Sequence, residues 1–166
     1  MQKSKKNNYI FATVLIVIFF VIIGVNRDWS TEEINFSLEE IVYRDVSYPQ
    51  VEAKIGGQKV SLAVAHTEEL RALGLSGVSR LSEGEGMLFP FPKEGSHAFW
   101  MKDTLMSLDI IWIDSDGIIV HIEPNVAPET YPQKFGEDID SQYVVELRAG
   151  GAAELRIEIG ETFQLL

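Results

Sequence analysis

The chain has 166 residues, of which 46% are apolar and 23% charged, and it contains six prolines and no cysteine. This composition suits a folded protein and excludes a disordered or collagen-like chain, while the lack of cysteine excludes disulfides, thiolate catalysis and cysteine-ligated zinc. The formal net charge of -11 argues against nucleic acid as a partner, because binding to phosphates normally requires a basic patch.

Residues 9–25 are predicted to anchor the chain in a membrane. Fifteen of these 17 residues are apolar, the exceptions being Thr13 and Gly24. A helix of this length reaches roughly 25 Å, which is about enough to cross the ~30 Å core of a bilayer with help from its flanks. Three lysines precede the segment, so residues 1–8 are expected in the cytoplasm and the rest beyond the membrane. The lipid bilayer is therefore the first predicted partner.

Two other interpretations of residues 9–25 stay open. A cleaved signal peptide has the same opening and would release a secreted protein, although residues 23–26 lack the small-x-small pattern of a cleavage site. An interfacial helix would lie on the membrane. In each case the part after residue 26 holds 11 basic and 25 acidic residues, so its formal charge is 11 minus 25, or -14. Such a charge suits cationic or neutral partners.

Residues 26–49 are acid-rich and predict a spacer, followed by a β-domain at residues 50–166. A short apolar run at residues 41–43 leaves open whether part of the spacer forms a strand or short helix on the domain. Residues 51–55 and 58–65 flank a Gly-Gly dipeptide, which accepts the positive φ angles of a two-residue hairpin turn. This pair is the clearest predicted hairpin.

The elements after this hairpin are predicted from their boundary residues. Thr67 is a good N-cap for a short helix at residues 68–73, which has two acids in its first turn. Residues 86–91 form an apolar run that contains one proline and is followed by another, which predicts an edge strand or an extended loop. An uncovered edge there would suit pairing with another protein.

Residues 108–113 and 118–122 are apolar and flank an Asp-Ser-Asp-Gly turn, so they predict a second, central hairpin. A loop with three prolines follows at residues 124–140 and is long enough to suggest a functional role. The last predicted elements are a strand at 143–147, a turn or short helix at 150–156 and a short strand at 162–165. Many short strands with little helix predict an antiparallel β-sandwich or jelly-roll-like barrel with one or two short helices.

Four motifs lie between residues 74 and 113. They are Gly74-Leu75 with Arg80, GMLFPF at 86–91, FWMKDT at 99–104 and SLDIIWI at 107–113. These motifs resemble those of the family called domain of unknown function 192, in which FWMKNT is the most specific block. The resemblance covers roughly residues 51–163. It implies a compact, jelly-roll-like β-sandwich, often behind a signal or anchor, and implies no agreed biochemical activity.

The chain departs from the family pattern at three positions. Ser76 stands where a methionine is usual, Asp103 where the family has asparagine, and Ser107 where it has proline. We expect the first and third departures to affect packing. Asp103 adds a negative charge beside Lys102 and is expected to alter whatever this loop binds.

Asp109 is the strongest chemical signal in the sequence, because a carboxylate within an apolar strand is costly to bury unless a cation or several donors meet it. Lys102, Arg71 and Arg80 are its plausible partners. The cluster can be structural and fasten the FWMKDT loop to the sheet, it can line a ligand pocket, or it can place Asp109 or Asp103 as a general base beside Lys102. The ligand-binding candidates are Arg71, Arg80, Trp100, Lys102, Asp103, Thr104 and Asp109.

No cofactor, metal or catalytic residue is predicted. The three histidines, at positions 66, 97 and 121, show no ligand spacing. Three functions remain: a membrane-tethered extracytoplasmic domain that binds a small polar ligand or a segment of an envelope protein, an envelope-acting enzyme with Asp/Lys acid-base chemistry, and an interaction module that pairs through an edge strand.

Overall fold

The computed structural model describes residues 40–43 and 46–166. They belong to the second of two units in the chain, Ile34–Leu166. The predicted tail, the predicted anchor at residues 9–25 and most of the predicted spacer lie outside the described residues. Within the part of the chain that is described, no helix has both the length and the apolar character that crossing a membrane requires.

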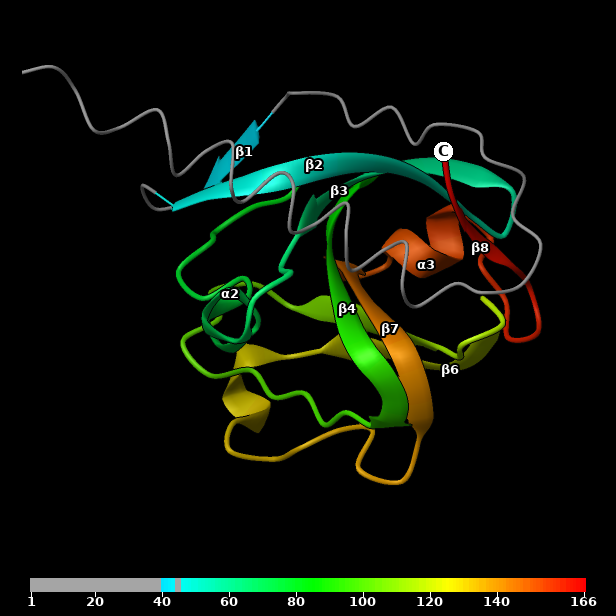
Figure 1. The fold of residues 1–166 in the computed structure, drawn as a ribbon. Coiled ribbons are helices and arrows are strands. Elements are labelled where there is room, and N and C mark those ends of the chain that lie inside the picture. Colours follow the sequence, from blue (N-terminus) through cyan, green and yellow to red (C-terminus); the bar gives the residue numbers. More distant parts are fainter. Residues whose placement is uncertain (1–39, 44–45) are drawn as a thin grey trace, which may run out of the picture. The chain divides into compact units, whose positions relative to one another are not determined.

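The described residues form eight strands, two α-helices and a short 3-10 helix (Figure 1). In chain order the elements are β1 (Glu40–Tyr43), β2 (Val46–Ile55), β3 (Gln58–Val64), α2 (Glu68–Leu73), β4 (Glu85–Ser96), β5 (Leu108–Ile113), β6 (Ile119–Val126), η1 (Pro128–Thr130), β7 (Asp140–Arg148), α3 (Gly151–Glu154) and β8 (Phe163–Leu165). The prediction of a mainly β fold with one or two short helices is confirmed.

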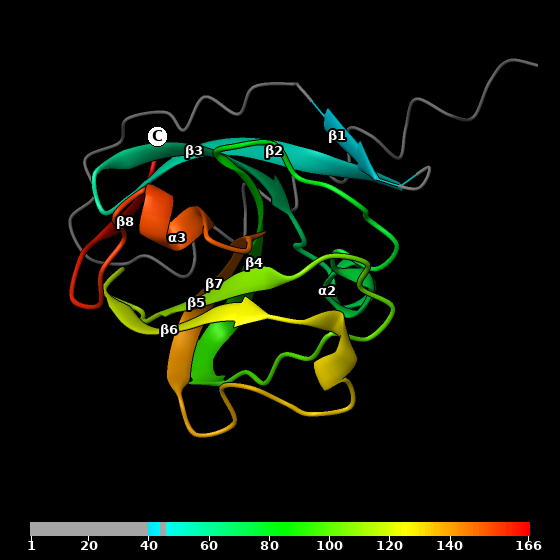
Figure 2. The ribbon, with the colours of Figure 1, turned by 180° about the vertical axis from the view of Figure 1, so that it is seen from behind.

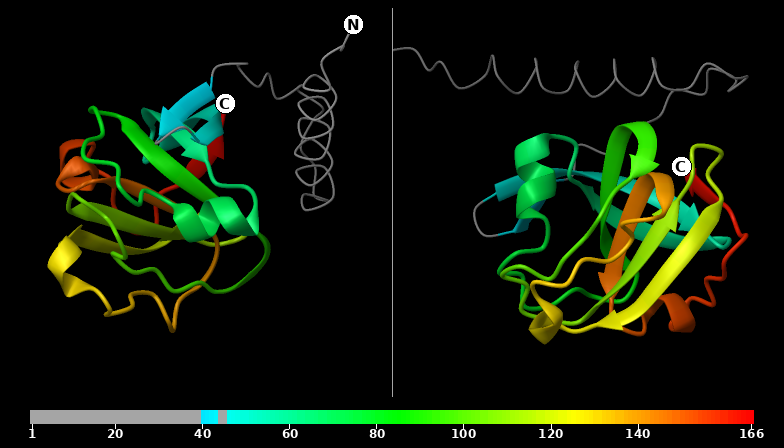
Figure 3. Two further views of the ribbon diagram at one scale, coloured as in Figure 1. Left: turned by 90° about the vertical axis from the view of Figure 1, so that its left-hand side faces the viewer. Right: turned by 90° about the horizontal axis from the view of Figure 1, so that it is seen from below.

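All eight strands belong to one sheet, in the order β1-β2-β3-β4-β7-β5-β6, with β8 paired to β2. The sheet is curled into a half-barrel, in which β2 and β3 cross above the β4–β7 pair (Figures 1 and 2). The two short helices, α2 and α3, lie at opposite sides of it (Figure 3). The predicted sandwich-like or barrel-like fold is thus confirmed in outline, and its strands belong to one continuous curled sheet.

The β3–β4 pair is parallel, whereas the predicted architecture was antiparallel throughout. A parallel pair needs a crossover connection that returns the chain to the same end of the sheet. Residues 65–84, which include α2, provide that connection.

The locally determined elements form where the sequence predicts them. In the first hairpin, Ile55 pairs with Gln58 across Gly56 and Gly57, whose φ angles are +56° and +78°. The helix α2 begins after Thr67, whose side chain accepts a hydrogen bond of 3.2 Å from the Leu70 amide. The second hairpin forms from β5 and β6, although β6 is the last strand in the sheet order and only β5 has a strand on both sides. At residues 41–43, where strand and helix were both open, the chain forms β1 and pairs with β2.

The prediction of an edge strand or loop at residues 86–91 is wrong. These residues form part of β4, which lies between β3 and β7 in the interior of the sheet. The prolines are tolerated because the pairing with β3 ends at Leu88, and a register shift follows Pro90 in the pairing with β7. Between Gly86 and Leu88, β4 is paired on both sides, so these residues provide no free edge for the predicted pairing with another protein.

The two faces of the sheet carry two separate apolar clusters. The first includes Ile55, Leu62 and Ile111, and α3 contributes to it through Ala152. The second includes Met87 and Trp112, with side chains of α2 packed against it. All six residues of β5 are buried, because its alternate side chains enter one cluster and then the other. This double burial explains why a polar residue in β5 needs dedicated partners.

Candidate functional site

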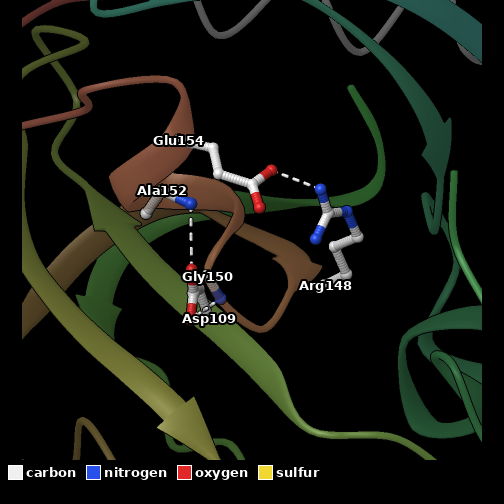
Figure 4. Close-up of polar contacts among 5 residues, drawn as sticks. All are labelled: Asp109, Arg148, Gly150, Ala152 and Glu154. Carbon is white, nitrogen blue, oxygen red and sulfur yellow. Dashed lines mark hydrogen bonds and ion pairs between the residues drawn. The ribbon is translucent and has the colours of Figure 1, made fainter. Parts of the chain in front are cut away.

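Asp109 is 1% exposed and is held by backbone amides. One carboxylate oxygen accepts a hydrogen bond of 2.9 Å from the amide of Asn125. The same oxygen accepts from Gly150 at 3.1 Å, and the other accepts from Ala152 at 2.9 Å (Figure 4). Three donors to one carboxylate replace much of the hydration that the charge loses on burial. The sequence predicted that a buried Asp109 would be met either by a cation or by several hydrogen-bond donors. The structure shows the second arrangement.

The donors come from segments whose backbone bends around the carboxylate. Gly150 and Asn125 both have positive φ angles, of +81° and +55°. Gly150 also precedes α3, so Asp109 accepts from the first amides of this short helix. Beside it, Arg148 at the end of β7 donates to Glu154 in α3 (Figure 4). Asp109 and this ion pair fasten the turn at residues 149–154 to the sheet.

The three predicted cationic partners of Asp109 lie elsewhere. Arg71 donates to the carbonyls of His66 and Pro90, and its guanidinium lies 5.2 Å from the centre of the Phe91 ring. Arg80 and Lys102 are exposed. Among the described residues no ion pair to Asp109 is present. The predicted neutralisation by a base is therefore wrong, since the carboxylate is met instead by hydrogen bonds from the amides of Asn125, Gly150 and Ala152.

The FWMKDT loop is held by backbone contacts with two other loops. Phe99 and Phe135 exchange two hydrogen bonds of 2.9 Å. The amide of Gly77 donates to the carbonyl of Asp103 at 2.8 Å, and the Ser76 hydroxyl donates to the carbonyl of Lys102 at 3.1 Å. Ser76, one of the departures from the family pattern, thus ties two loops together through a hydrogen bond.

Asp103 is exposed and has a φ angle of +55°. Asparagine and aspartate accept this left-handed conformation more readily than most residues, so either of them suits the backbone at this position. The exposed side chains of Asp103 and Lys102, together with the partly buried Thr104, lie apart from the buried Asp109. The structure does not assemble Asp103, Lys102 and Asp109 into one acid-base cluster.

An exposed aromatic pair joins this loop to the loop that follows η1. Trp100 and Tyr131 are each 45% exposed, and their rings meet edge to face with centroids 5.7 Å apart. The ammonium of Lys134 lies 6.0 Å from the centre of the Trp100 ring. We call these three residues the aromatic platform. The sequence singled out Trp100, whereas Tyr131 and Lys134 were noticed only as part of a long loop of suspected function.

A second buried carboxyl group, that of Glu146 in β7, was missed by the sequence analysis. Its residue is 5% exposed, and burial raises the pKa of its carboxyl to about 8. The residue sits between Met87 and Ile110 on the neighbouring strands. The signal that marked Asp109 was present here too, because Glu146 lies between two apolar residues in the stretch YVVELR.

Residues 51–165 match the model of the DUF192 family, described as "Uncharacterized ACR". The chain belongs to this family. The match includes the FWMKDT loop, Asp109 and Glu146, so each of the features above is part of the family domain. The resemblance seen in the sequence motifs is confirmed, and the family itself carries no assigned activity.

Two solved structures resemble this member of the family. One is a "putative transcription regulator" from Sinorhizobium meliloti 1021, with 28% identity and a TM-score of 0.68 over 72% of this chain and 96% of that chain. The other is a protein of unknown function from Novosphingobium aromaticivorans DSM 12444, with 24% identity and a TM-score of 0.66 over 82% of this chain and 99% of that chain. No curated protein matches the chain. The likeness to the second structure concerns the fold alone.

Proposed function

We propose that this member of the DUF192 family is a membrane-tethered, extracytoplasmic domain that binds a small polar ligand on its aromatic platform. The observation that carries the proposal is the pairing of Trp100 with Tyr131, two large aromatic side chains that remain 45% exposed while in contact with each other. Exposed aromatic groups cost free energy in water, and they are enriched where ligands and partners bind.

The surroundings of the platform favour a neutral polar ligand with one apolar face, such as a sugar. An aromatic ring offers an apolar surface for such a face, and the Lys134 ammonium can donate hydrogen bonds to hydroxyl groups at its rim. The backbone bridge between Phe99 and Phe135 holds the two loops in place, which lowers the entropy cost of binding.

The acidic charge of the domain supports this class of ligand over nucleic acid. The part after residue 26 has a formal charge of -14, and one cation beside one aromatic pair does not make a basic patch. The name of the Sinorhizobium meliloti protein applies to that protein, and the charge of the present chain disfavours DNA binding here. An acid-base enzyme has less support, because Asp109 is engaged by three amides.

The binding proposal is tested with the full chain in mild detergent and an N-acetylglucosamine trisaccharide as the first probe. We expect saturable binding by calorimetry, and a loss of affinity of about tenfold or more in Trp100→Ala and Tyr131→Ala. Ile159→Ala is the matched control, because Ile159 is an exposed apolar residue outside the platform. Folded platform variants that bind the trisaccharide as tightly as the wild type would contradict the proposed site.

The proposed location rests on the apolar segment at residues 9–25 and the lysines before it. Protease added outside intact spheroplasts should digest the domain, while the domain stays with the membrane fraction. Sequencing the N-terminus of the mature protein separates an intact anchor from a cleaved signal. A domain protected until the cells are lysed would place it in the cytoplasm and overturn this part of the proposal.

A further inference from the structure

An ion pair borders the aromatic platform. The ammonium of Lys134 lies 6.0 Å from the centre of the Trp100 ring and 3.8 Å from a carboxylate oxygen of Glu137. Both charged side chains face solvent, with exposed fractions of 49% for Lys134 and 60% for Glu137. Glu137 therefore adds a carboxylate to the rim of the platform, beside the ammonium. We call Lys134 and Glu137 the rim pair.

The backbone that carries the rim pair is bonded to the segment that leads to Trp100. Phe135, next to Lys134 in the chain, exchanges two hydrogen bonds of 2.9 Å with Phe99. The carbonyl of Glu137 accepts a hydrogen bond from the hydroxyl of Ser96. The rim pair and the Trp100 ring thus belong to two segments that are joined at two places, so little ordering of the backbone is needed when a ligand binds.

The charged groups of the rim pair keep their capacity for hydrogen bonds. The distance of 3.8 Å between them exceeds that of an N–H···O hydrogen bond, which is about 2.7 to 3.2 Å. In the part of the chain that the structure describes, the ammonium and the carboxylate have no other polar partner. The ammonium therefore still offers donors, and the carboxylate still offers acceptors, to a ligand on the platform.

We propose that Glu137 and Lys134 together determine the specificity of the platform and select sugars with two adjacent free hydroxyl groups. This inference rests on the proposed binding of a sugar by Trp100 and Tyr131. One hydroxyl accepts a hydrogen bond from the ammonium, and its neighbour donates one to the carboxylate, so each charged group obtains a partner. The ring that carries the two hydroxyls lies with its apolar face on the aromatic side chains.

The opposite charges of the rim pair favour a neutral ligand over an ionic one. An anionic group is attracted by Lys134 and repelled by Glu137, and a cationic group experiences the reverse. Two adjacent hydroxyls provide an acceptor for one charge and a donor for the other. A sugar that lacks these hydroxyls leaves both charged groups without a ligand partner after the site has lost water, which lowers its affinity.

The test compares the N-acetylglucosamine trisaccharide with an analogue. The trisaccharide has one pair of adjacent hydroxyls, on the third and fourth carbons of its non-reducing end, and the analogue is the same molecule without these two hydroxyls. Calorimetry on the full chain in mild detergent gives both affinities. We expect the wild type to prefer the trisaccharide by about tenfold or more.

Variants of the rim pair should lose this preference. Glu137→Leu and Lys134→Met keep bulk and remove the charged groups, so each should reduce the preference, and the double variant should bind both sugars equally within about twofold. Lys59→Met with Glu52→Leu is the matched control and should keep the preference, because these residues form an exposed ion pair of 3.7 Å outside the platform. Exposed ion pairs contribute little to stability, so the variants should fold, which circular dichroism checks.

The outcomes separate this inference from the proposed function. If the wild type binds both sugars equally and Trp100→Ala weakens both, the platform binds sugars and the inference is wrong. An unchanged preference in either folded single variant also overturns it. If the wild type binds neither sugar, the proposed site and the inference both fail. Should Glu137→Leu not fold, Glu137→Gln provides the same test, because a neutral acceptor replaces the charged one and the preference should fall.

Discussion

The carboxylate of Asp109 and the backbone amide of Ala152 are joined by a hydrogen bond of 2.9 Å across 43 residues of sequence. Asp109 lies in β5 and Ala152 in the short helix α3, so the contact helps to fix the turn that the Arg148–Glu154 ion pair also holds. The carboxylate accepts a second hydrogen bond from the same turn, at Gly150, and a third from Asn125 in β6, which makes it a structural group within the family domain.

Asp109→Asn should therefore destabilise the domain by about 2 to 4 kcal/mol, because a carboxamide offers one acceptor oxygen where the carboxylate offers two, and its NH₂ group faces a donor amide. Chemical unfolding of the full chain in mild detergent measures this change. Asp116→Asn is the matched control at an exposed position of the β5–β6 turn and should change stability by less than about 0.5 kcal/mol. Equal stability of the two variants would contradict the structural role of Asp109.

Glu146→Gln should stabilise the domain in a pH-dependent manner. The folded carboxyl has its pKa raised from 4.5 to about 8, so the unfolded chain ionises at lower pH than the folded one. Ionisation of the unfolded state alone makes wild-type stability fall as the pH rises from about 4.5 to about 8, and glutamine removes this dependence. At pH 7 the variant should be more stable by roughly 3 kcal/mol.

Unfolding curves of wild type and Glu146→Gln at pH 4, 6 and 8.5 check this prediction. The difference between the two proteins should be small at pH 4 and largest at pH 8.5. A difference that is constant across this range would show that Glu146 ionises with an ordinary pKa.

Gly86→Ala should destabilise the sheet because the position has no room for a side chain. A Cβ atom there would lie 2.5 Å from the carbonyl oxygen of Glu146 and 2.7 Å from a methyl group of Leu147. We expect a loss of about 1 to 3 kcal/mol. Gly95→Ala is the control in the same strand, since a Cβ at Gly95 has no neighbour within 4 Å among the described residues. Thermal unfolding of both variants decides the point.

Gly136→Ala tests the loop that carries Tyr131 and Lys134. Gly136 has a φ angle of +79°, and a Cβ there would collide with the indole of Trp112. Gly160→Ala is the matched control, because Gly160 has a φ angle of +92° and open space around it. Both variants share the strain of a positive φ, and the collision should cost Gly136→Ala a further 1 to 3 kcal/mol or so. Similar melting temperatures for the two variants would contradict the close contact with Trp112.

The features predicted correctly from sequence are those that short stretches determine. The turn at Gly56-Gly57 and the cap at Thr67 depend on a few adjacent residues, and both form as predicted. The position of β4 depends on its pairing with β3 and β7. Its two prolines suggested an edge strand, because the sequence does not show that the pairing with β3 stops before them. Local chemistry therefore identified the elements, and long-range pairing decided their places.

In the candidate sites, too, single residues could be identified from the sequence, whereas their partners could not. The burial of Asp109 follows from its position in LDIIWI, but its partners at residues 125, 150 and 152 are remote in sequence and are backbone groups, which no side-chain pattern marks. The contact between Trp100 and Tyr131 depends on the bridge between Phe99 and Phe135. Glu146 was detectable by the reasoning applied to Asp109, since both interrupt an apolar strand.

The pairing of β8 with β2 has a consequence for how the protein is made. Ile55 pairs with Phe163, and the amide of Leu166 donates to the carbonyl of Glu52 at 2.9 Å. During synthesis, the hairpin of β2 and β3 leaves the ribosome long before β8 exists, so one flank of β2 stays unpaired until residues 163–165 emerge. Nascent chains that stop short of residue 163 should therefore remain open to proteases and chaperones.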